Sequence, residues 1–69
     1  MRVSQLLKVM DKDDEIVIDD FGKRIDEMRI YNGTVRGITR DDPINKMHIY
    51  SVAAYDHTII VLAGAPTNN

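Results

Sequence analysis

The densest group of chemically active side chains is acidic and lies near the start of the sequence. Asp11, Asp13, Asp14 and Glu15 fall within five consecutive positions. An EF-hand calcium loop counted from Asp11 needs glycine at its sixth position and glutamate at its twelfth, but the chain has isoleucine and glycine there. The run is therefore predicted to be a solvated connection between a helix and a strand. The alternative is an acidic contact surface for a basic partner.

The second candidate site combines two arginines with a tyrosine. Asn32-Gly33, placed between alternating apolar and polar residues, is typical of a two-residue type I′ hairpin turn. In that hairpin Arg29 lies directly opposite Arg36, and Tyr31 shares their polar face. Opposed like charges cost stability unless acids compensate them. Either nearby acidic side chains compensate the two arginines, or a phosphate or an acidic side chain of a partner binds between them. We expect Arg29, Tyr31 and Arg36 to bind a ligand or a partner.

No catalytic or metal-binding motif accompanies these residues. The sequence has no cysteine, and His48 and His57 are nine positions apart, unlike the ligand spacing of zinc sites. It also has no P-loop, no nucleophile-elbow serine and no HExxH motif. The sequence therefore predicts a protein that is not an enzyme and needs no metal and no cofactor.

The charge distribution argues against a nucleic-acid partner. The net charge is −2, and only residues 21–46 are positive, with six basic and four acidic side chains. No predicted helix has a basic face, and Tyr31 and Tyr50 are the only aromatic residues expected on strands, unlike an RNA-binding sheet. A nucleic-acid-binding regulator stays only as a further alternative.

A short helix and several strands must position these candidates. The helix is predicted from an apolar face with i, i+3, i+4, i+7 spacing, formed by Val3, Leu6, Leu7 and Met10. Ser4 is its expected N-cap. Strands are predicted over 15–19, on both sides of Asn32-Gly33, over 46–54 and over 58–63.

The connections complete the predicted fold. Turns are expected at residues 20–23, where Gly22 is free to take positive φ, and at residues 55–57. The loop around Pro43 has room for one helical turn. The predicted class is α+β, with one short N-terminal helix on an antiparallel sheet of about five strands. A single domain covers residues 1–63, and residues 64–69 form a flexible tail.

The last two predicted strands are apolar on both faces. Ile60 and Leu62 lie on the face opposite Ile59 and Val61, whereas an antiparallel strand with one wet face alternates with polar residues. One short helix covers only one side of a sheet, and a chain of 69 residues buries only a small core. We therefore expect a homodimer or a higher homo-oligomer. The alternative is a curled barrel that covers itself.

The segments VSQLLKVMDKDDEIVI and IYNGTVRGI resemble short, largely uncharacterised phage and prophage accessory proteins of Gram-positive bacteria. Those proteins begin with a valine-serine-leucine helix and an Asp-Lys-Asp turn, continue with an acidic strand and a tyrosine-containing stretch that ends in glycine, and close with an apolar strand. The resemblance covers residues 1–38 and the last strand, and it does not extend to residues 40–50 or the tail.

The resemblance implies a protein that acts by binding. The first expectation is a non-catalytic inhibitor of a host protein, in particular of an anti-phage defence system. The alternative is an oligomeric sponge that sequesters a signalling nucleotide. No secretion signal or membrane-spanning run is predicted, since the longest apolar run covers only residues 59–63. We therefore expect a cytoplasmic location in the host bacterial cell and no membrane partner.

Overall fold

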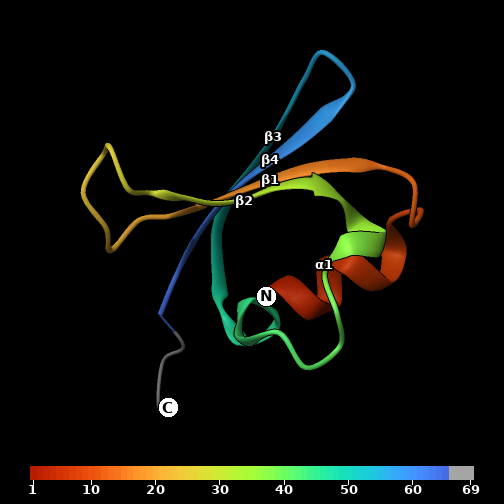
Figure 1. The fold of residues 1–69 in the computed structure, drawn as a ribbon, viewed down its shortest axis with the longest axis horizontal. Coiled ribbons are helices and arrows are strands. Elements are labelled where there is room, and N and C mark those ends of the chain that lie inside the picture. The colour runs from red at the N-terminus through yellow and green to blue at the C-terminus, as the bar shows by residue number, and fades with distance from the viewer. Residues whose placement is uncertain (66–69) are drawn as a thin grey trace.

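The computed structural model describes residues 1–65, which form one four-stranded sheet with a helix packed on one side (Figure 1). The elements are α1 (Val3–Val9), β1 (Glu15–Asp20), β2 (Arg29–Thr34), the 3₁₀ helices η1 (Val35–Gly37) and η2 (Pro43–Lys46), β3 (His48–Tyr55) and β4 (Thr58–Gly64). The predicted α+β class with one short N-terminal helix is confirmed, with four strands in place of about five. β4 includes Gly64, where the tail was expected to begin, and residues 66–69 of that tail lie outside the described residues.

The sheet is mixed rather than antiparallel, with the strand order β2-β1-β4-β3. β1 pairs antiparallel with β2 and parallel with β4, and β4 pairs antiparallel with β3. After β2 the chain passes through η1 and η2 on the helix side of the sheet and enters β3 at the far edge (Figure 1). The β3–β4 hairpin then inserts β4 next to β1. The parallel pair therefore follows from this long connection.

The predicted hairpin at Asn32-Gly33 is wrong. Both residues lie inside β2 and pair with β1, and Gly33 does not have positive φ. The two-residue turn with positive φ is instead Asp56-His57, at 50° and 65°, and it joins β3 to β4. β2 runs straight through the glycine because pairing with the apolar strand β1 outweighs the local preference for a turn.

The other turns lie at the positions that the sequence predicts. The turn after β1 is closed by the Lys23 amide, which donates to the Asp20 carbonyl at 3.1 Å, although Gly22 does not adopt positive φ. The helical turn expected near Pro43 is η2. It is capped by Asp42, whose side chain accepts a hydrogen bond from the Ile44 amide at 3.0 Å.

α1 begins two residues earlier than a Ser4 N-cap would require. Arg2 is the N-cap, and its amide donates to the Gln5 side chain at 2.8 Å. Val3, the first helical residue, is fully buried, and its amide donates to the Met47 carbonyl at 2.9 Å. The helix therefore starts where it docks onto the chain that leads into β3, because seven residues are too few for a helix to be stable alone.

The core lies between α1 and one face of the sheet. Its buried members are Val3, Ile16, Ile18, Val35, Ile38, Met47, Val61 and Ala63. The predicted helix face is confirmed, since Leu6, Leu7 and Met10 pack partly buried against this core. Within residues 1–65, α1 and η2 lie on the same side of the sheet, and no helix covers the other side (Figure 1).

Candidate functional site

Arg29 and Arg36 each form an ion pair with a different carboxylate. Arg29 begins β2 and its Nε lies 3.1 Å from an oxygen of Asp19. Arg36 lies in η1, and its Nη2 is 3.1 Å from an oxygen of Asp13. The predicted direct opposition of the two arginines is therefore wrong, because it depended on the turn at Asn32-Gly33. Their role in binding stays a prediction.

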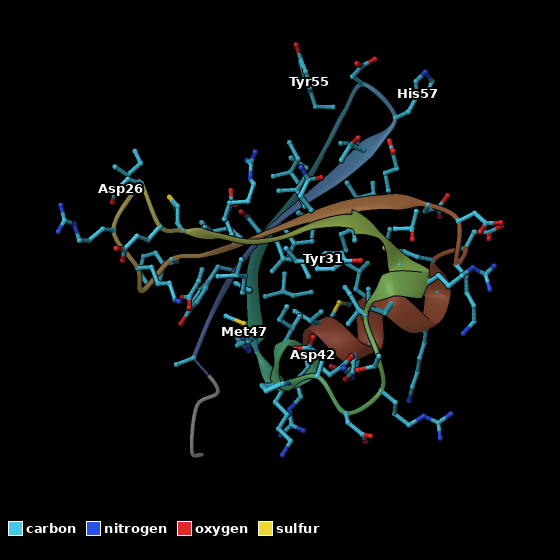
Figure 2. The ribbon with its side chains drawn as sticks, viewed as in Figure 1. Asp26, Tyr31, Asp42, Met47, Tyr55 and His57 are labelled. Atoms are coloured by element: carbon cyan, nitrogen blue, oxygen red, sulfur yellow. The ribbon has the colours of Figure 1, made fainter. Side chains whose placement is uncertain are left out.

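Tyr31 packs beneath the sheet instead of sharing an exposed face with the arginines (Figure 2). It pairs with Ile18 of β1 and is partly buried against the core. Its hydroxyl donates a hydrogen bond to the Thr34 carbonyl at 2.6 Å. A side chain on Gly33 or Gly37 would collide with this hydroxyl. Both glycines thus make room for the tyrosine, which is the reason that a glycine can be retained inside β2.

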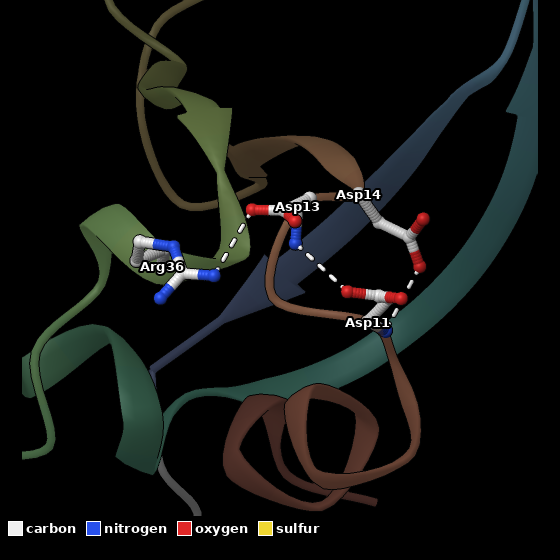
Figure 3. A network of polar contacts seen from close by, with 4 residues as sticks. All are labelled: Asp11, Asp13, Asp14 and Arg36. Carbon is white, nitrogen blue, oxygen red and sulfur yellow. Dashed lines mark hydrogen bonds and ion pairs between the residues drawn. The ribbon is translucent and has the colours of Figure 1, made fainter.

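The acidic run is the predicted connection between helix and strand (Figure 3). The Asp14 side chain accepts from the Asp11 amide at 2.9 Å, and the Asp11 side chain accepts from the Asp13 amide at 3.1 Å. Short acidic side chains often satisfy backbone donors in this way. The side chain of Asp13 is left to face Arg36, and the Asp14 carbonyl accepts a hydrogen bond from the Val35 amide at 3.0 Å, which holds the start of η1.

A cavity of about 360 Å³ opens beside α1, and we call it the basic cavity. Its lining residues are Ser4, Leu7, Lys8, Met10, Lys12, Val35, Arg36, Ile38, Arg40 and Asn45. Sequence reasoning singled out only Arg36 as a site residue of this set. Lys8 and Lys12 were missed because they come from a segment far from Arg36 in the sequence, and only the folded chain brings them to one cavity.

Backbone hydrogen bonds hold the segments around the basic cavity. The Arg36 amide donates to the Lys12 carbonyl at 2.9 Å, and the Ile38 amide donates to the Val35 carbonyl at 3.0 Å. The Asn45 side-chain amide donates to the Thr39 carbonyl at 2.8 Å. It also donates to the carbonyls of Arg40 and Asp42. The loop that carries Arg40 is therefore tied to η2 by one side chain.

The second notable surface is the outer edge of the sheet along β3, which is free beyond Ile49. At its start the Ile49 amide donates to the Met1 carbonyl at 2.8 Å, and Arg2 forms an antiparallel bridge with His48. We define the β3 surface as residues 48–55 together with Phe21. Tyr50 is 51% exposed and Phe21 is 60% exposed, and their ring centroids are 5.1 Å apart. The ring of His48 meets Tyr50 edge-on at 5.3 Å. An exposed aromatic cluster therefore lies at one end of this edge.

The other end of β3 projects away from the body of the protein. Tyr55 is 75% exposed and lies at the tip of the β3–β4 hairpin beside His57 (Figure 2). Between the aromatic ends, Val52 is 47% exposed, and the neighbouring alanines are exposed as well. β3 carries no Asp, Glu, Lys or Arg. The predicted cover for both sides of this strand is not provided by residues 1–65 of a single chain.

Residues 1–65 lack two further kinds of feature, a metal-binding cluster and a membrane-spanning helix. This part of the chain contains no group of three or more His, Asp or Glu side chains that could hold a metal ion. None of its helices combines the length and the apolar composition that crossing a membrane requires.

Comparison with known proteins gave no match. No protein-family model, no curated protein sequence and no solved structure matches this chain.

Proposed function

We propose that this chain is a non-catalytic, phage-encoded binding protein that inhibits a host protein, in particular one of an anti-phage defence system. The resemblance of residues 1–38 to phage accessory proteins supports the viral setting. The observation that carries the binding function is the β3 surface, where exposed aromatic rings accompany a strand edge that is unpaired beyond Ile49 within residues 1–65.

Two properties of the β3 surface favour a protein partner. Tyrosine and other aromatic residues are enriched in protein interfaces, where they contribute most of the binding energy. An extended segment of a partner can also add to an exposed strand edge through backbone hydrogen bonds. Edge strands are usually protected by charged residues or proline, and β3 contains neither. This edge is therefore suited to accept a strand from a partner.

A second copy of the chain can use the same edge. Two β3 strands would pair antiparallel about a twofold axis, which is the commonest symmetry of homo-oligomers. Tyr50 and Tyr55, exposed by 51% and 75%, offer together about 250 Å² per copy if a tyrosine side chain presents roughly 200 Å². Two copies thus supply from four tyrosines alone about half of the ~1,000 Å² expected of a specific interface. We propose this homodimer as the state that protects the edge before a host protein binds.

Affinity capture with matched baits tests the proposed function. The wild-type chain, Ala54→Lys and Ile25→Lys would each be used to capture proteins from extracts of a Gram-positive host. Ala54 is an exposed residue of β3, whereas Ile25 is 88% exposed in the loop between β1 and β2. We expect one host protein to be enriched on the wild-type and Ile25→Lys baits and lost from Ala54→Lys.

The captured protein must then lose its activity when the purified wild-type chain is added. Equal capture by all three baits would contradict a role for the β3 surface. Capture without any effect on the activity of the host protein would contradict inhibition. Circular dichroism of each bait verifies that the variants are folded.

A further inference from the structure

The basic cavity carries an inference beyond the proposed function. It shares no residue with the β3 surface. Four of its lining residues are basic, namely Lys8, Lys12, Arg36 and Arg40, and none is acidic. A concave site lined by charges of one sign concentrates the electrostatic field and attracts ions of opposite charge.

Most of these basic groups have no carboxylate partner in the described part of the chain. Among residues 1–65, no ion pair forms at Lys8, Lys12 or Arg40. Arg36 contacts Asp13 through one of its terminal nitrogens, but both side chains are largely exposed, at 64% and 80%. Exposed ion pairs of this kind are weak and easily exchanged. The cavity therefore keeps a positive potential.

Apolar side chains complete the lining of the basic cavity. Leu7 and Met10 come from the α1 side, and Val35 and Ile38, which are buried, come from η1 and the residue that follows it. This combination suits a ligand with an anionic group and an apolar or aromatic body. Small-molecule sites are typically lined mostly by apolar side chains with a few convergent polar groups.

We propose that the basic cavity binds a phosphorylated small molecule of about the size of a mononucleotide. Arg36 and Arg40 would hold the phosphate, since guanidinium groups pair with phosphate oxygens through two parallel hydrogen bonds. Lys8 and Lys12 add positive charge, and the apolar lining takes the body of the ligand. The volume of about 360 Å³ lies near the lower end of the range for small-molecule sites.

This site differs from the oligomeric sponge predicted from the sequence. A sponge of that kind places nucleotide pockets between subunits, whereas the basic cavity is built within one chain by α1, η1 and the residues around Asn45. Binding at this cavity therefore does not require a dimer. An experiment can therefore disprove pairing through the β3 surface without disproving ligand binding at the basic cavity, and the reverse also holds.

The test is a titration of the ¹⁵N-labelled full chain, followed by two-dimensional NMR. The probes are phenyl phosphate and AMP, with inorganic phosphate, phenol and adenosine as controls. We expect both phosphorylated probes to shift the amide signals of Leu7, Val35 and Ile38, and to bind at least tenfold more tightly than any control. The affinity should fall as salt is added, because the phosphate contacts are electrostatic.

Matched arginine variants show whether the cavity is the binding site. Arg40→Gln removes a charge from the lining, while Arg24→Gln removes the same charge from an exposed loop where Arg24 faces Asp26. We expect at least a tenfold loss of phenyl phosphate affinity for Arg40→Gln and none for Arg24→Gln. The absence of shifts with both phosphorylated probes would overturn the proposal, and so would equal losses in the two variants. Binding of adenosine or phenol as tight as that of the phosphorylated probes would also overturn it.

Discussion

At the scale of single residues, Tyr31 and Gly37 form a steric pair. The Tyr31 hydroxyl donates to the Thr34 carbonyl at 2.6 Å and occupies the space that a side chain on Gly37 would need. A phenol ring is rigid, so it cannot yield as a flexible side chain would. This contact holds the end of β2 and η1 in a fixed position relative to each other.

Gly37→Ala should destabilise the protein by about 1–3 kcal/mol, the usual cost of forcing extra atoms into a packed site. Tyr31→Phe should cost about 1 kcal/mol through the lost hydrogen bond. In the double variant the collision is relieved, so the combined cost should fall below the sum by at least about 0.5 kcal/mol. Urea denaturation of the four proteins measures these free energies. Strict additivity would show that the two residues do not touch.

The ion pair between Asp13 and Arg36 links the acidic run to the basic cavity (Figure 3). Asp13→Asn should change the free energy of unfolding by less than about 1 kcal/mol, because the pair is exposed. It should also strengthen phenyl phosphate binding severalfold, since Arg36 no longer faces a carboxylate. Asp26→Asn is the matched control, as it breaks the exposed pair with Arg24 outside the cavity. Unchanged affinity in Asp13→Asn would remove Arg36 from the phosphate site.

At the scale of elements, the β3–β4 hairpin contains backbone strain. Asp56 and His57 both have positive φ, a conformation that costs most L-residues roughly 1–2 kcal/mol but that aspartate, like asparagine, tolerates better. Asparagine and glycine are the preferred residues at these two positions of a type I′ turn. The hairpin therefore forms despite the unfavourable backbone conformation of His57, because β4 is held between two neighbouring strands.

Replacing Asp56-His57 by Asn-Gly should stabilise the protein by about 1 kcal/mol, because it relieves the unfavourable backbone conformation. The expected result is a higher melting temperature by calorimetry. Asn32→Thr is the companion variant: inside a strand threonine is favoured, so it should be neutral or stabilising. A large loss of stability in Asn32→Thr would contradict the position of Asn32 within β2.

At the scale of the whole molecule, the two edges of the sheet are not equivalent. β2 begins with Arg29, which is engaged by Asp19, and it passes directly into η1. β3 is longer, uncharged and exposed along most of its length. An edge of this kind is a template for pairing with another chain. Association should therefore proceed through β3.

Light scattering after size exclusion should give the mass of a dimer for the wild-type chain at tens of micromolar. Ala54→Lys should shift the protein to a monomer, because a lysine on an otherwise uncharged edge strand opposes pairing with a second strand. Ile25→Lys adds the same charge away from the edge and should remain dimeric. A monomeric wild type would refute self-pairing and leave the edge to a host protein alone.

Elements whose signal is local can be predicted from the sequence alone. The helix follows from apolar residues at helical spacing, and the strand around Ile16 and Ile18 and the last two strands follow from short apolar runs. The connecting role of the acidic run was likewise readable, because short acidic side chains cap turns. These features survive in the structure since local preference and tertiary packing agree.

Tertiary structure decided the parts that depend on distant segments. It placed Asn32-Gly33 in a strand, because pairing with β1 and burial of Tyr31 outweigh a turn preference. It made β1 and β4 parallel through the long connection under the sheet, and it gave Arg29 and Arg36 separate acidic partners. It also assembled the basic cavity from segments that no spacing rule connects. Contacts across the chain set these features, because burial and strand pairing act between residues that are neighbours only after folding.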